Sequence, residues 1–162
     1  MSRSRLHPLR VNPTTGEPYL RLPSPHENII ITPPRMSDVG ALVGHLNDHK
    51  VVNSLIGPPY PYLTSHAEGW ISNVKKASDG LLVELEGDHQ EESDDQLKVV
   101  GGCPVHYIRE VADDGTETFI GDLFVHRCEF PHEGAQRAAL AEENTARLVG
   151  DPAIVWCVGG TL

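Results

Sequence analysis

Two histidines four residues apart, His45 and His49, have the spacing of a metal-binding pair on one helix. In zinc enzymes with this spacing a glutamate follows the first histidine, and the helix continues through both. Here Leu46 takes the glutamate position, and Asn47-Asp48 is expected to interrupt the helix. We therefore predict no metal site at this pair.

A cysteine next to flexible glycines offers a second kind of chemistry. Cys103 follows Gly101-Gly102, and His106 or His126 could reach it across a hairpin and activate the thiol as a nucleophile. The alternative is that Cys103 is a small buried hydrophobic residue, which is the usual role of a cysteine on a strand. We expect the second role.

The apolar periodicity predicts the elements that hold these side chains. The β-branched run at 29–32 is closed by two prolines and predicts a short buried strand. Apolar residues then recur at helical spacing over 39–46 and again over 49–56, which predicts two short helices. Gly57-Pro58-Pro59 is expected to end the second.

A third helix is expected from Ser65 onward. Ser65–Glu68 has the spacing of a capping box, in which side chains satisfy the free backbone N–H groups of a helix start. The apolar stripe that follows runs to Val74, and Asp79-Gly80 predicts the end of the helix.

The second half of the chain has strand-like patterns that predict an antiparallel meander. Runs rich in Val, Leu, Ile, Phe and Tyr place its strands at 81–85, 98–108 and 118–128. Asp113-Asp114-Gly115 predicts a hairpin turn between the last two. An alanine-rich helix is expected at 135–149, followed by a fourth strand at 153–158.

The composition indicates one globular domain. The chain has 162 residues, of which 39% are hydrophobic. Its formal net charge of -10 argues against nucleic acid as a partner, because a phosphate-binding surface is basic. No apolar run approaches the roughly 20 residues of a membrane span, so no membrane partner is expected. Three widely spaced cysteines predict neither disulfides nor a zinc site and favour a cytoplasmic location.

Two segments are expected to lie outside the folded body. Residues 1–27 combine arginines with closely spaced prolines, which favour extended, solvated chain, so we predict a flexible tail and a domain at 28–162. Residues 86–96 are strongly acidic, and their mutual repulsion predicts a disordered loop.

The order of these elements, with several short sequence matches, resembles the N-terminal part of a GNAT-superfamily N-acetyltransferase of the Rim-type branch. The matching segments are Thr32–Asp38, Leu46–Asp48, Pro59–Tyr62, Ala67–Ile71 and Ile120–Asp122. The resemblance implies an α+β fold with a mainly antiparallel sheet flanked by helices. It also implies transfer of an acetyl group from acetyl-CoA, as co-substrate, to an amine of a protein N-terminus or small molecule.

The resemblance further implies which residues meet the two substrates. The backbone beside Cys157 and Val158, on the fourth strand, would contact the acetyl and pantetheine groups, although their side chains fit equally a buried strand. Asp122 could face the acceptor cleft and attract a cationic amine, or face solvent. Tyr60 and Tyr62 could line the mouth of that cleft, or pack against the core. The catalytic residues are not identified.

The chain departs from the family where the pyrophosphate of coenzyme A would bind. In the family an Arg/Gln-x-x-Gly-x-Gly/Ala loop after the fourth strand opens a helix, and its backbone N–H groups bind the anion. The nearest match, Arg147–Pro152, precedes the expected strand and ends in proline. We therefore expect an incomplete GNAT fold that is inactive as this truncated chain.

The alternative is a non-catalytic interaction module. The apolar strand at 153–158 would be an open sheet edge in an incomplete fold, and an open edge can pair with another strand. This interpretation predicts a partner protein or self-association through that edge.

Overall fold

A computed structural model describes residues 6–55, 57–87 and 99–161. The strands are β1 (Arg10–Val11), β2 (Pro18–Arg21), β3 (Ile29–Thr32), β4 (Tyr107–Val111), β5 (Glu117–Arg127) and β6 (Trp156–Thr161). The α-helices are α1 (Val39–Asn47), α2 (His49–Val52), α3 (Thr64–Glu86) and α4 (Arg137–Ala146), with short 3-10 helices η1 (Met36–Asp38) and η2 (Gly134–Gln136).

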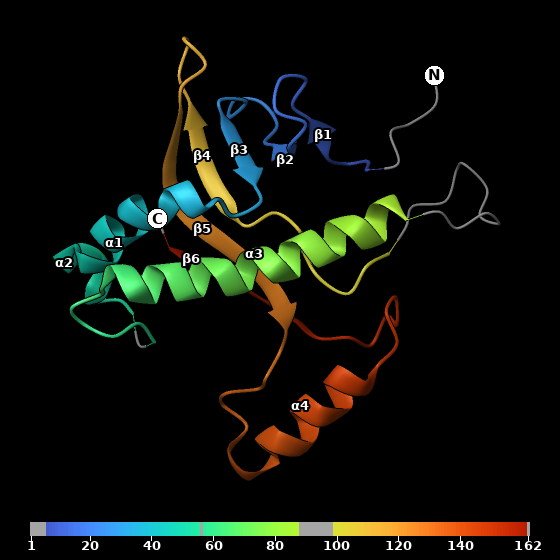
Figure 1. Ribbon diagram of the computed structural model, residues 1–162. Coiled ribbons are helices and arrows are strands. Elements are labelled where there is room, and N and C mark those ends of the chain that lie inside the picture. The colour runs from blue at the N-terminus through green and yellow to red at the C-terminus, as the bar shows by residue number, and fades with distance from the viewer. Residues whose placement is uncertain (1–5, 56, 88–98, 162) are drawn as a thin grey trace.

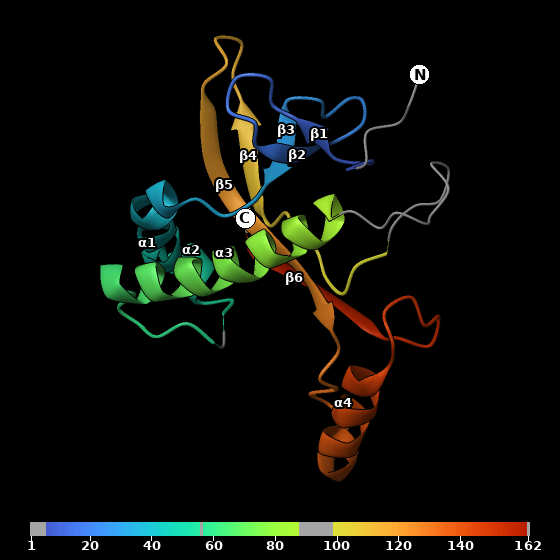
Figure 2. The same cartoon turned by 45° about the vertical axis from the view of Figure 1, so that its right-hand side comes forward.

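The strands form one antiparallel sheet in the order β1-β2-β3-β4-β5-β6. Figures 1 and 2 show α3 crossing in front of this sheet, with α1 and α2 beside its N-terminal half. Helix α4 lies beyond the end of β5, away from the other helices in both views. The predicted α+β class, with a mainly antiparallel sheet flanked by helices, is confirmed.

The prediction of a solvated N-terminal tail is wrong for the described part of residues 1–27. Strand β1 pairs with β2, and β2 pairs with β3, so this segment extends the sheet. Leu9 is buried in a cluster with Ile31 and Val105. Prolines are compatible with this arrangement because Pro18 is the first residue of its strand. Residues 1–5 lie outside the described part of the chain.

Helix α3 is longer than predicted at both ends. It begins at Thr64, where the Leu63 N–H donates to His66 Nδ1 at 3.1 Å, so the expected capping box of Ser65–Glu68 does not form. It continues to Glu86, so the strand predicted at 81–85 is wrong. Gly80 does not end the helix, because a glycine inside a helix costs only about 1 kcal/mol.

Packing favours helix over strand at the end of α3. Leu82 and Leu85 pack against the cluster that contains Leu9. Of the acidic loop predicted at 86–96, Glu86 belongs to α3 and Gly87 follows it. The rest of that segment lies outside the described residues.

The hairpin between β4 and β5 forms as predicted. The Ala112 N–H donates to the Thr116 carbonyl at 2.9 Å, and Gly115 adopts a φ of 83° that favours glycine. However, β4 begins only at Tyr107, nine residues after the predicted start of that strand at Lys98. The segment before it contains Gly101-Gly102 and Pro104, which disfavour a regular ladder.

Side chains fix the limits of α4 and β6. Arg127 donates to the carbonyls of Asn144, Thr145 and Arg147, which closes α4 before the predicted end at Val149. The Asn144 side chain bonds both backbone groups of Val155. Strand β6 therefore begins at Trp156, later than the predicted 153, and continues through Gly159-Gly160 to Thr161.

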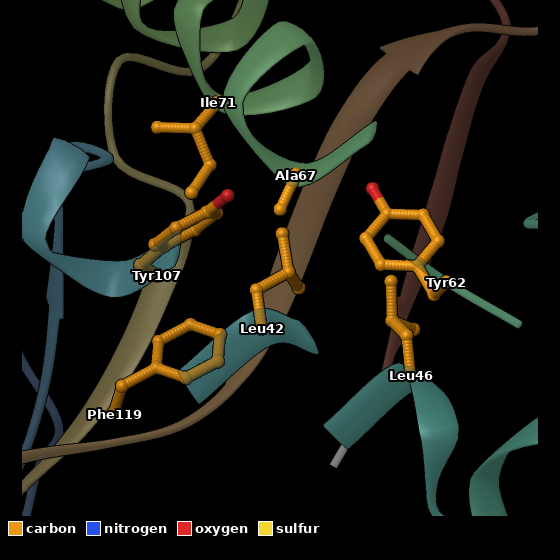
Figure 3. Packing of buried hydrophobic residues seen from close by; sticks show 7 residues of the cluster. All are labelled: Leu42, Leu46, Tyr62, Ala67, Ile71, Tyr107 and Phe119. Carbon is orange, nitrogen blue, oxygen red and sulfur yellow. The ribbon is translucent and has the colours of Figure 1, made fainter. Parts of the chain in front are cut away.

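The larger hydrophobic cluster lies between α1, α3 and the β4–β5 hairpin (Figure 3). Its buried members are Leu42, Leu46, Tyr62, Ala67, Ile71, Tyr107 and Phe119. The Tyr107 and Phe119 rings lie 5.0 Å apart between centroids. This cluster fixes α3 over β5 and so forms the floor of the candidate site.

Candidate functional site

A groove of about 730 Å³ lies where α1, α3 and the proline-rich segment before α3 meet β5 and β6. Its apolar walls come from Leu42, Leu46, Leu55, Pro58, Pro59, Tyr62, Trp70 and Phe124. Its polar side chains are Ser65, His66, Asn73, Asp122 and Thr161. The capacity of the groove is that of a small-molecule site.

Asp122 is the one carboxylate among the described residues that line this groove, and no lysine or arginine is among them. It is 8% exposed. Its Oδ1 accepts the Thr161 backbone N–H at 2.9 Å and also the Thr161 hydroxyl. These bonds orient the carboxylate and attach the end of β6 to β5.

Two phenols lie close to this carboxylate. Burial and the charge of Asp122 raise the pKa of Tyr62, and the same two causes raise the pKa of Tyr107. Figure 3 shows the two rings on either side of Ala67. The Tyr107 hydroxyl is buried without a hydrogen-bond partner among the described residues. Both phenols are therefore neutral at physiological pH and able to donate a hydrogen bond.

A second groove of about 430 Å³ continues from the first along α3 and β5. The two share Trp70, Asn73, Asp122 and Phe124. The second adds His106 and His126 to the lining. Burial lowers the pKa of His106 below its ordinary value, so this imidazole is neutral at physiological pH. Asp122 thus stands at the junction of two largely apolar grooves.

The structure brings together some of the residues predicted to form the site. Tyr62 and Asp122 both line the first groove. Tyr60 does not line it: the Tyr60 side chain is 59% exposed, and its ring lies 6.3 Å from that of His49. Cys157 and Val158 lie on β6, outside the groove, and Val158 is 70% exposed.

The structure also places His45, which was considered as a metal ligand, and Cys103, which was considered as a nucleophile. His45 stacks on Phe119 with ring centroids 5.2 Å apart. In residues 6–55, 57–87 and 99–161, no group of three or more His, Cys, Asp or Glu side chains could hold a metal ion. Burial raises the pKa of the Cys103 thiol, which opposes the formation of a nucleophilic thiolate.

Sequence reasoning missed Trp70 and Thr161. Trp70 fits the apolar stripe of a helix, which gives no sign that 48% of the side chain remains exposed at a groove. Thr161 follows two glycines near the end of the chain, and its contact with Asp122 depends on the pairing register of β5 and β6. No signal in the local sequence reveals that register.

No protein-family model, no curated protein and no solved structure matches the chain. Among the described residues, no helix combines the length and apolar character needed to cross a membrane.

Proposed function

We propose that the groove binds the acceptor amine of an N-acetyltransferase. The observation that carries this proposal is the position of Asp122, an oriented carboxylate in a groove whose other described lining side chains carry no fixed charge. A carboxylate in apolar surroundings attracts an ammonium group more strongly than one in water, because the local dielectric constant is lower. The resemblance in short sequence motifs supplies the reaction class.

Acetyl transfer requires the amine to lose a proton before it attacks the thioester carbonyl. The new N–C bond forms as the C–S bond breaks, and the leaving thiolate takes up a proton. His66 is poorly placed as the base, because its Nδ1 already accepts the Leu63 N–H and its Nε2 then carries the ring proton. Asp122 Oδ2 is the better acceptor, since Thr161 bonds only the other oxygen.

The acetyl donor would lie along β6. The resemblance places the acetyl and pantetheine groups of acetyl-CoA beside the backbone of Cys157 and Val158. These residues share a strand with Thr161, which contacts Asp122. The donor and the amine would therefore meet near the end of β6, with Asp122 on the amine side.

A titration followed by NMR tests the amine site. Primary amines should shift the Trp70 indole N–H signal, while Trp156, which lines neither groove, serves as an internal reference. Asp122→Asn should weaken amine binding about tenfold, because Asn keeps an oxygen for Thr161 but removes the charge. Equal binding of the amine by Asp122→Asn would contradict the proposal.

The transfer step needs its own measurement. The chain is incubated with acetyl-CoA and an amine that it binds, and mass spectrometry follows the acetylated product. Product formation that is lost in Asp122→Asn would support the enzyme and overturn the expectation that this chain is inactive. Amine binding without product agrees with that expectation, because the chain lacks the loop that would bind the coenzyme A pyrophosphate, and the proposal then rests on the amine site alone.

The second candidate is an interaction module that uses β6. This strand lies last in the sheet order, and the described residues provide no partner on its other side. Val155, Trp156 and Val158 are 46%, 40% and 70% exposed. An exposed apolar edge favours strand pairing with another chain. Self-association that Val158→Lys abolishes, measured by light scattering, would favour this candidate, and a monomer at all concentrations would oppose self-pairing.

A further inference from the structure

The exposed aromatic rings beside Asp122 bear on the kind of amine that the groove accepts. Trp70 on α3 is 48% exposed and Phe124 on β5 is 36% exposed, and both line both grooves. Large apolar rings left open in the same grooves as a carboxylate gain free energy when a ligand covers them. A small polar amine would leave these rings in water.

The distribution of charge in the grooves argues against diamines and polyamines as ligands. Asp122 is the one acidic side chain among the described residues of either groove. A diamine or polyamine would place its second ammonium against apolar walls without a carboxylate, which is costly. A single ammonium attached to an apolar body fits both the charge and the walls.

We propose that the preferred ligand is a primary amine joined within a few bonds to a bulky aliphatic or aromatic group. This inference rests on the proposed amine site. The ammonium lies at Asp122, and the apolar group fills the first groove against Leu46, Leu55 and Pro58. Trp70 is the specificity-determining residue, because it is the more exposed of the two aromatic residues that line both grooves.

Two sources present this chemistry. One is a peptide whose first residue is large and apolar, and the other is a free hydrophobic amine. The second groove gives a peptide room to continue past Asp122, beside Asn73 and His106. A free amine would leave that groove empty.

The test measures dissociation constants by NMR, with the Asn73 side-chain amide as a reporter that remains in every variant. The probes are 3-methylbutylamine, ethylamine, 1,4-diaminobutane and the neutral alcohol 3-methyl-1-butanol. Each fully buried methylene tightens binding about fourfold, and 3-methylbutylamine has three more carbons than ethylamine, so with partial to full burial it should bind roughly ten- to sixtyfold more tightly. The diamine and the alcohol should bind more weakly than 3-methylbutylamine.

Variants separate this inference from the proposed function. Trp70→Ala should reduce the preference for 3-methylbutylamine over ethylamine several-fold, whereas Asp122→Asn should weaken both amines and keep their ratio. Val83→Ala is the matched control on the same helix, because Val83 is 68% exposed and lines neither groove. Thermal melting of each variant checks that it folds.

The outcomes are distinct. If both amines bind equally and depend on Asp122, the amine site stands and the apolar preference is overturned. If the alcohol binds as tightly as 3-methylbutylamine, the amine site itself fails. Comparison of Leu-Gly-Gly with 3-methylbutylamine assigns the source: tighter binding of the peptide identifies an N-terminus, and equal or weaker binding identifies a free amine.

Discussion

Arg109 and Asp38 form a buried two-point ion pair that joins β4 to η1. Arg109 Nη1 lies 3.0 Å from Asp38 Oδ1, and Nη2 lies 2.6 Å from Oδ2. Arg109 Nε also donates to the Thr32 hydroxyl at 2.9 Å. The residues are 2% and 5% exposed, so neither charge is solvated. The pair holds the start of α1 against the sheet.

Removal of one member of this pair should be strongly destabilising. Arg109→Met leaves the Asp38 carboxylate buried and without its partner, which is expected to lower the free energy of unfolding by about 3–5 kcal/mol. Urea unfolding measures the change. The double variant Arg109→Met with Asp38→Leu should regain most of the loss, and a double variant as unstable as the single one would contradict this account.

The N-terminal segment should contribute to stability. Leu9 is 9% exposed and packs with Ile31 and Val105, so Leu9→Ala is expected to cost about 2 kcal/mol. Val11→Ala is the control, because Val11 is 45% exposed. If both variants unfold at the wild-type urea concentration, the segment is not part of the folded body.

Local patterns predicted the elements whose signals lie within a few residues. The β-branched run of β3, the apolar stripe of α1 and the glycine of the β4–β5 hairpin are such cases. Local patterns failed where contacts between residues distant in the sequence determine whether a segment forms a helix or a strand. The end of α3 is helical because Leu82 and Leu85 pack against a cluster with Leu9, and β1 and β2 exist because β3 is available to pair.

The candidate site was predictable to a similar degree. Asp122 and Tyr62 stand out locally, as a charge in an apolar strand and an aromatic ring between prolines. Asp38 directly precedes α1, but Arg109, which pairs with its carboxylate, is 71 positions away. Thr161 likewise meets Asp122 across 39 positions. Such pairs follow from sheet register and not from local spacing.

The hydroxyl of Tyr107 should add nothing to the stability of the unliganded chain. It is buried without a hydrogen-bond partner among the described residues. Tyr107→Phe is therefore expected to leave the free energy of unfolding unchanged or to raise it by up to about 1 kcal/mol, because the unpaired hydroxyl is removed and the ring remains. Tyr107→Leu, which leaves a cavity, should destabilise. A loss in Tyr107→Phe would show that the hydroxyl has a partner.

The buried imidazole of His106 should make stability depend on pH. Its pKa in the folded chain lies below the ordinary value of 6.5, while the unfolded chain keeps that value. Between the two pKa values the unfolded chain binds more protons, so this contribution is complete above about pH 6.5 and is lost as the pH falls through the folded pKa. The negative charge of Asp122 partly offsets this lowering of the His106 pKa.

Urea unfolding of wild type and His106→Gln at pH 7 and pH 5 isolates this effect. The stability of the wild type relative to the variant should fall at the lower pH, because Gln does not titrate. The exposed His132→Gln is the matched control. A difference between wild type and His106→Gln that stays constant over this range would show that the burial of His106 does not govern its titration.

Gly160 should be essential to the contact between β6 and Asp122. A Cβ atom on Gly160 would lie 2.4 Å from the Asp122 backbone oxygen, a separation that requires the strands to move apart. Gly160→Ala is therefore expected to cost about 2 kcal/mol of stability and to weaken amine binding through the displaced Thr161.

Gly80→Ala is the matched control, because Gly80 lies in α3 with nothing within 4 Å of the added atom. That variant should gain about 0.5–1 kcal/mol from helix propensity. If Gly160→Ala unfolds like the wild type and binds amines equally well, the close approach of β6 to β5 is not what orients the Asp122 carboxylate.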